Sequence, residues 1–230
     1  VDSYCGKSTD SPTVAVLGDS HAGQLLHGFA TNTNPKFNRV IAFVGANCPP
    51  ALGVDTRPDC ARLVAVAMDE ITKTPSVEYL VVGAYYTYVS VADSPWGEQL
   101  LAGYRRTFNT AIAAGKKVVF VIDNPALVQS PESCVPMPFK IRTVMKIYPE
   151  FCNGAAEADL RPKAEYLKFV DHLRSEFPTV FFYDPRQILC PEKKCMLFYD
   201  SKLLFGDANH LSIYGSDYVV NDLVQRLSNP

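Results

Sequence analysis

Residue types that could together perform nucleophilic catalysis occur near both ends of this chain. A short apolar run ends abruptly in Gly18-Asp19-Ser20, and Asp207 and His210 stand three residues apart near the C-terminus. A serine hydroxyl attacks poorly unless a base removes its proton. At this spacing an aspartate can orient one ring nitrogen of the histidine and leave the other free to act as that base. We therefore predict that the fold brings Ser20, His210 and Asp207 together.

The elements that would position these residues form a regular series. Five apolar runs cover 13–17, 39–44, 77–82, 117–122 and 179–183, and helical patterns cover 21–31, 61–73, 97–114, 162–176 and 213–227. This alternation predicts an α/β fold, a doubly wound parallel sheet of about five strands with helices on both faces. A ligand site in such a sheet lies beyond the C-terminal ends of the strands, where Ser20 is expected.

Length and composition favour one globular domain. The chain has 230 residues, 47% of them hydrophobic and 20% charged, with a formal net charge of -2. We assign 13–230 to a single domain and 1–12 to an N-terminal extension or linker. The stretches near 124–161 and 184–206 are too long for ordinary connections and are predicted to be insertions that form lids or binding walls. Without a basic stripe, nucleic-acid binding is not expected.

Seven cysteines indicate an oxidising compartment. Three pairs flank local loops: Cys48 with Cys60, Cys134 with Cys152, and Cys190 with Cys195. None of them has the doubled Cys-x-x-Cys or Cys/His spacing of a zinc site, so we predict three disulfides and no metal. The alternative is a set of reduced, partly buried thiols. Cys5 is either free or paired with a residue upstream of Val1, and the absence of an initial Met is consistent with a piece of a longer protein.

The two end motifs also carry a family resemblance. Gly18-Asp19-Ser20 with Asp207-x-x-His210, on a strand and helix pattern that spans the whole chain, resembles the SGNH (GDSL-like) hydrolase superfamily, whose fold is flavodoxin-like. The motifs Gly-Asp-Ser-His at 18–21, Asn-Cys-Pro-Pro at 47–50, the 190–195 loop and His-Leu-Ser at 210–212 followed by Gly215 are similar to SGNH domains fused behind membrane acyltransferase-3 domains. Those proteins O-acetylate bacterial surface glycans, and their SGNH part lies in the periplasm.

The resemblance implies roles for the end motifs. Ser20 would be the nucleophile, His210 the general base and Asp207 the residue that orients it. The backbone N–H of Ser20 would also donate a hydrogen bond to the oxyanion. We expect Asp19 to act as a structural cap and His21 to be a packing or hydrogen-bonding residue.

The remainder of the oxyanion hole departs from the superfamily pattern. A Gly after the second strand and an Asn after the third complete the hole in the superfamily. Gly45 stands at the first position, whereas Tyr85 occupies the position of the Asn. We predict that Asn47, in the loop after the second strand, supplies a donor in its place.

Other residues at the same rim are candidates for binding substrate. Tyr85, Tyr86 and Trp96 form an aromatic-rich loop whose flat faces suit sugar rings, although aromatic residues in such a place also serve as core or edge packing. Asn124 follows the fourth strand and either reaches the site or forms the turn before Pro125.

The expected function is that of a periplasmic O-acyltransferase domain, the soluble part of an inner-membrane protein. An acetyl group would pass through a Ser20 ester to a hydroxyl of an envelope polysaccharide such as O-antigen. No cofactor is expected to bind in this domain, because the chain has no Gly-rich phosphate cradle. Acetyl-CoA would instead supply the acetyl group upstream, through an acyltransferase-3 domain in the same polypeptide. The alternatives are a carbohydrate acetyl esterase with the same triad and a glycan-presenting module with a relict site.

Overall fold

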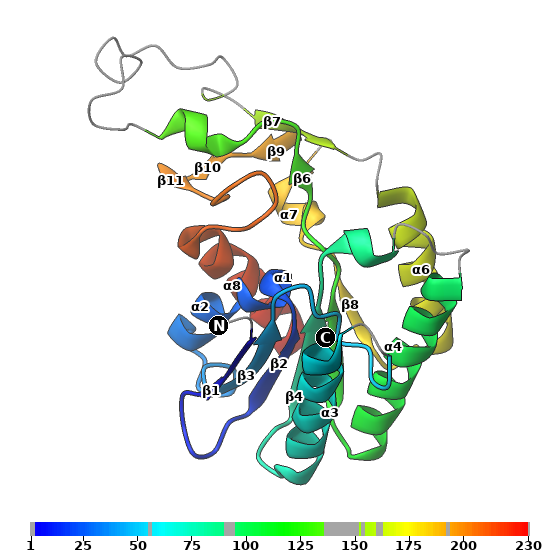
Figure 1. Cartoon of the computed structure of the whole chain (residues 1–230). Coiled ribbons are helices and arrows are strands. Elements are labelled where there is room, and N and C mark those ends of the chain that lie inside the picture. The colour runs from blue at the N-terminus through cyan, green and yellow to red at the C-terminus, as the bar shows by residue number, and fades with distance from the viewer. Residues whose placement is uncertain are drawn as a thin grey trace.

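A six-stranded sheet forms the centre of the molecule, with the strand order β1-β3-β2-β4-β5-β8 (Figure 1). The computed structural model describes residues 3–54, 57–89, 95–135, 152, 155–159, 163–191 and 194–229. The strands are β1 (Ser3–Lys7), β2 (Val14–Gly18), β3 (Val40–Gly45), β4 (Tyr79–Gly83), β5 (Lys117–Val121) and β8 (Phe181–Tyr183). The last five pair in parallel. The predicted doubly wound parallel sheet is confirmed.

Both faces of the sheet are covered by helices, which explains why its strands read as continuous apolar runs. Along β2, Ala15 and Leu17 belong to one core cluster, and Val14 and Val16 belong to the other. The first cluster includes residues of α3 (Pro58–Lys73), α4 (Pro95–Ala113) and α6 (Lys163–Glu176). The second includes residues of α1 (Ser20–Gly23), α2 (Leu26–Thr31) and α8 (Ile213–Ser228).

The helix predicted over 21–31 is wrong in one respect, because the chain forms two short helices there instead of one. Helix α1 ends at Gly23, and α2 begins at Leu26. Between them the Leu25 N–H bonds to the Ala22 carbonyl, three residues back, so the α-helical pattern is interrupted. The interruption leaves the Gln24 side chain directed at the loop that carries His210, as described below.

Strand β1 adds an edge to the sheet that the sequence pattern does not show. Residues 1–12 were assigned to an extension or linker, yet Ser3–Lys7 pairs antiparallel with β3, from Ser3 opposite Gly45 to Lys7 opposite Ile41. An edge strand is held by backbone hydrogen bonds and needs no regular apolar alternation. The sequence Ser-Tyr-Cys-Gly-Lys has none.

The two predicted insertions meet in a second, smaller sheet. Its order is β6-β7-β9, with β6 (Ala126–Leu127), β7 (Ala155–Asp159) and β9 (Lys194–Met196). Strand β7, from the first insertion, pairs antiparallel with β9, from the second. A hairpin of β10 (Phe198–Tyr199) and β11 (Lys202–Leu203) follows. Figure 1 shows these strands grouped beyond the C-terminal ends of the parallel strands, at the end of the main sheet where α1 begins.

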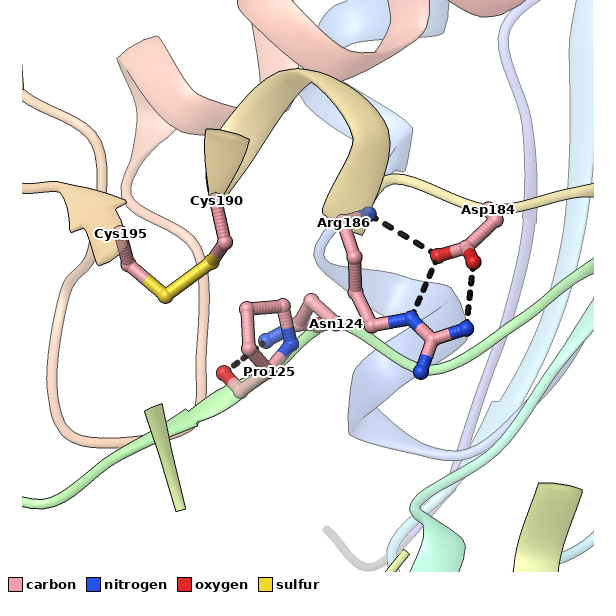
Figure 2. The surroundings of a disulfide bond; sticks show 6 residues. All are labelled: Asn124, Pro125, Asp184, Arg186, Cys190 and Cys195. Atoms are coloured by element: carbon pink, nitrogen blue, oxygen red, sulfur yellow. Dashed lines mark hydrogen bonds and ion pairs between the residues drawn. A yellow bond between two sulfur atoms is a disulfide. The ribbon is translucent and has the colours of Figure 1, made fainter. Parts of the chain in front are cut away.

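Three disulfides join the cysteine pairs that the spacing predicts, Cys48–Cys60, Cys134–Cys152 and Cys190–Cys195. Figure 2 shows the last of them, which connects the end of α7 (Arg186–Leu189) to β9. Helix α7 begins at an ion pair in which Arg186 Nε donates to Asp184 Oδ1 at 2.7 Å. Cys5 is a free, exposed thiol. Within the described ranges, no helix combines the length and the apolar character needed to cross a membrane.

Candidate active site

The turn that presents Ser20 depends on glycine at position 18. Gly18 has φ of +153° and pairs with Gly83 of β4. A Cβ at this position would lie 1.9 Å from the Gly83 carbonyl oxygen, so any side chain would collide with the neighbouring backbone. After this close approach, Asp19 caps α1 by accepting a hydrogen bond from the His21 N–H at 2.8 Å. Ser20 therefore stands exposed at the first position of the helix.

Ser20, His210 and Asp207 lie in one hydrogen-bonded chain, although 190 residues separate the first two. Ser20 Oγ is 2.9 Å from His210 Nε2, and His210 Nδ1 is 2.8 Å from Asp207 Oδ2. In this arrangement His210 can take the proton of the Ser20 hydroxyl while Asp207 stabilises the resulting imidazolium.

The Asp207 carboxylate is fixed by its own backbone. Its Oδ1 accepts hydrogen bonds from the N–H groups of Asn209 at 2.8 Å and His210 at 2.7 Å. Burial acts to raise the pKa of Asp207, but these two bonds and the imidazole outweigh it, and the pKa lies below its ordinary value. The group is therefore ionised at neutral pH and able to orient the His210 ring.

Two amide side chains hold the backbone on either side of His210. Gln24 Oε1 accepts from the Leu211 N–H at 2.7 Å, and Asn124 Nδ2 donates to the Asn209 carbonyl at 2.7 Å. Gln24 Nε2 also donates to Asn124 Oδ1 at 2.6 Å, so the two amides are linked. Asn124 is 3% exposed. Where we predicted a contact with substrate, the Asn124 side chain is buried and bonded to the loop that carries His210.

Two buried carboxylates lie beneath the serine. Asp19 Oδ2 accepts from the Tyr85 N–H at 2.9 Å, and Asp123 Oδ2 accepts from the Tyr86 N–H at 3.1 Å. Burial raises the pKa of Asp19, against the lowering effect of the hydrogen bonds from the Tyr85 and His21 N–H groups and of the His21 charge. These bonds join the loop after β4 to the ends of β2 and β5. They also occupy the backbone donors of that loop, at the position where the superfamily has its Asn.

His21 is a hydrogen-bonding residue, as the sequence predicts, and its partner is Asp123. The distance from His21 Nδ1 to Asp123 Oδ1 is 2.7 Å. The His21 ring stacks on Tyr85 with 4.5 Å between centroids and lies 4.6 Å from the His210 ring.

The predicted aromatic platform is divided by burial. Tyr86 is 5% exposed and belongs to the core, which leaves no face for a sugar ring and corrects its predicted contact with substrate. Trp96, in the first turn of α4, is partly buried against the same core cluster. Tyr85 is partly buried, and its hydroxyl accepts a hydrogen bond from Asn209 Nδ2 at 3.3 Å. Tyr85 therefore contacts the loop that carries His210.

The predicted oxyanion donors lie at the ends of two adjacent strands. The Ser20 N–H is in the first turn of α1, where backbone N–H groups have no partner within the helix. Gly45 ends β3, one residue beyond Val44, which pairs with Gly18. Asn47 follows in an exposed turn with φ of +54°. Their contribution to an oxyanion hole remains a prediction.

Gln24 and Asp123 are the site residues that sequence reasoning missed. Asp123 follows β5 directly, and the rule that parallel strand ends converge on the site could have identified it. Gln24 carries no such signal, because a glutamine in a helical stretch is usually exposed.

Among the described residues, no group of three or more His, Cys, Asp or Glu side chains is arranged to hold a metal ion.

Comparisons with known proteins agree with this geometry. The model of the family described as SGNH domain (fused to AT3 domains) matches residues 1–225. A search of curated protein sequences found no match. Among solved structures, the periplasmic domain of a lipopolysaccharide acetyltransferase from Salmonella ser. Paratyphi A is similar with a TM-score of 0.67 and 16% identity, over 94% of this chain and 84% of that one.

Two esterases share the fold at lower similarity. The aryl esterase of M. smegmatis has a TM-score of 0.54 and 11% identity, over 94% of this chain and 98% of that one. The acetyl xylan esterase AlAXEase has a TM-score of 0.52 and 13% identity, over 93% and 98%. These structural similarities show the fold, whereas the match to the family model covers residues 1–225 and shows the family. This chain belongs to the family of SGNH domains that are fused to AT3 domains.

Proposed function

We propose that this chain is an O-acyltransferase domain that carries an acetyl group on Ser20 and passes it to a hydroxyl of a cell-envelope polysaccharide such as O-antigen. The observation that supports this most is the hydrogen-bonded chain from Ser20 through His210 to Asp207, with distances of 2.9 and 2.8 Å. A relict site would have no reason to keep these two contacts. In this family the SGNH domain is fused to an AT3 domain, and this arrangement supports transfer to an envelope component.

The reaction has two halves that use the same base. In the first, His210 removes the Ser20 proton as Oγ attacks the acetyl carbonyl, and the proton then passes to the leaving group as its bond to the carbonyl carbon breaks. This leaves an acetyl ester on Ser20 and a neutral His210. In the second, His210 removes the proton of the acceptor hydroxyl, whose oxygen attacks the ester carbonyl. The bond to Ser20 Oγ breaks, and Oγ takes the proton back.

The source of the acetyl group is proposed to be a membrane acyltransferase-3 domain in the same polypeptide, supplied with acetyl-CoA. The proposed location is the periplasm, as in the Salmonella lipopolysaccharide acetyltransferase domain. Three disulfides support an oxidising compartment.

Replacement of Ser20 by Ala in the full-length protein tests the proposal. Acetylation of the envelope glycan, measured by mass spectrometry of the extracted polysaccharide, should be abolished at an unchanged protein level. Ser175→Ala is a matched control, because Ser175 is an exposed serine on α6 whose hydroxyl donates to the His172 carbonyl. Full acetylation with Ser20→Ala would end the proposal. Together with saccharide binding by the purified chain, it would instead support a glycan-presenting module.

A carbohydrate acetyl esterase is the second candidate, favoured by the exposure of Ser20 and by the likeness to AlAXEase. Such an enzyme should hydrolyse a chromogenic acetyl ester at a rate abolished by His210→Ala. A transferase should release acetate slowly and form acetylated sugar when an oligosaccharide acceptor is added. The ratio of acetylated sugar to free acetate therefore separates the two candidates.

A further inference from the structure

A second His–Asp pair, His21 with Asp123, lies next to the Ser20 site. This second pair is buried, whereas the first pair, His210 with Asp207, is partly exposed. The side chains of His21 and Asp123 are 3% and 0% exposed, whereas those of His210 and Asp207 are 34% and 43% exposed. The proposed reaction gives the buried pair no chemical step. Burial of two polar groups nevertheless carries a free-energy cost unless both are hydrogen-bonded, so their presence calls for a reason.

Asp123 is fixed from several directions. Its Oδ1 lies 2.7 Å from His21 Nδ1, and its Oδ2 accepts from the Tyr86 N–H. Its own N–H donates to the Tyr166 hydroxyl at 2.9 Å. The His21 backbone is held as well, because its N–H donates to Asp19. The His21 ring is therefore bonded to a carboxylate that is itself held in place, and the His21 backbone is held by Asp19.

The His21 ring is in contact with the His210 ring. The His21 ring contacts two other rings, Tyr85 at a centroid distance of 4.5 Å and His210 at 4.6 Å. Asp207 holds Nδ1 of the His210 ring, but both residues of that pair are partly open to solvent. Contact with a buried, rigid ring would limit rotation of His210 away from Ser20.

We propose that His21, fixed by Asp123, is a positioning residue that keeps Nε2 of His210 directed at Ser20 Oγ. The inference rests on the proposed role of Ser20 as the nucleophile. His21 acts only through His210 and contacts neither donor nor acceptor. The competing explanation is that the pair merely stabilises the core at the ends of β2 and β5.

The reaction of Ser20 with a fluorophosphonate probe tests the inference without needing the natural donor or acceptor. His21→Phe keeps a ring but loses the bond to Asp123, and His21→Asn keeps a donor but loses the ring. Both variants of the purified chain should be labelled about 10- to 100-fold more slowly, as expected when a reacting group is displaced by about 1 Å. Tyr183→Phe is the matched control, because it removes a partly buried 2.8 Å hydrogen bond to Asp222 that joins β8 to α8. It should lower thermal stability and leave the labelling rate unchanged.

A double-mutant cycle separates positioning from stability. In a His210→Ala background, His21→Phe should cause no further loss of labelling rate, because the residue through which it acts is gone. An equal further loss in that background, or full labelling rates in both folded His21 variants, would overturn the inference and leave Ser20 as the nucleophile. Failure of both variants to fold would assign His21 to the core alone and also overturn it. If the unaltered chain is not labelled, the proposed function itself fails.

Discussion

Replacement of Asp207 by Asn is expected to inactivate the site while leaving the fold nearly intact. Both carboxylate oxygens accept hydrogen bonds: Oδ1 accepts from two backbone N–H groups, and Oδ2 accepts from the N–H at His210 Nδ1. An asparagine has one acceptor oxygen. The two backbone donors, at 2.8 and 2.7 Å, should keep that oxygen at the Oδ1 position, which turns the amide NH₂ toward His210.

The consequence is a change of tautomer. His210 Nδ1 would become an acceptor and Nε2 would carry the proton, so Nε2 could no longer take the proton of Ser20. A change of this kind lowers turnover by about 10⁴-fold in a serine protease triad. The backbone hydrogen bonds remain, so the free energy of unfolding should fall by only about 1 kcal/mol.

The assay is the rate of Ser20 labelling or of ester cleavage, with urea unfolding measured on the same samples. Asp217→Asn is a matched control, because Asp217 lies 3.6 Å from the Nε2 atom of His27, an Asp–His pair formed by α2 and α8. It should leave the rate unchanged. Retention of more than about a tenth of the rate with Asp207→Asn would refute the tautomer argument, because the expected loss is about a thousand times greater.

Three further outcomes are expected, each measured by urea unfolding. Gln24→Leu removes the acceptor of the Leu211 N–H and should lower the free energy of unfolding by about 2 kcal/mol, and an unchanged value would contradict this. Replacing Cys48 and Cys60 by Ala should lower it by about 3 kcal/mol, the value for closing a loop of about this length, and an unchanged midpoint would contradict this. Because the folded pKa of Asp207 is depressed, its stabilisation is present above the unfolded pKa of about 3.9 and is lost as the pH falls through the folded value. Asp207→Asn should therefore flatten the loss of stability between about pH 5 and pH 2, and an unchanged slope would argue against the shift.

The parts of the fold that follow from the sequence are those with continuous apolar patterns. The five parallel strands are buried on both faces and read as unbroken apolar runs, and all five occur in the main sheet. Strands β1, β6 and β9 are short or lie at edges, and these strands and β7 are held by backbone pairing that no side-chain pattern records. The contact between the two insertions does not follow from the sequence for the same reason, because the pairing of distant strands such as β7 and β9 depends on register.

Some site residues could likewise be predicted from the sequence and others could not. Ser20, Asp207 and His210 could be found because each belongs to a short motif with a chemical reason for its spacing. Asp123 is a single aspartate after a strand, and its meaning depends on β5 lying beside β4, the strand that precedes Tyr86. Gln24 was expected within a continuous helix and gains its role from the interruption of that helix. Positioning residues are therefore harder to predict than the residues that they position.

The loop after β4 bears on the choice between hydrolysis and transfer. The N–H groups of Tyr85 and Tyr86 are bonded to Asp19 and Asp123, so that loop offers neither the Asn side chain of the superfamily nor these two backbone donors to an oxyanion. Each missing donor slows acyl transfer by about 100-fold or more, for water and sugar alike. A hydroxyl held beside His210 can regain this through proximity, which is worth about 10⁵ M or more in effective concentration, whereas water gains nothing from binding. Because the loss is the same for both acceptors, the ratio of transfer to hydrolysis depends on whether a glycan hydroxyl binds beside His210.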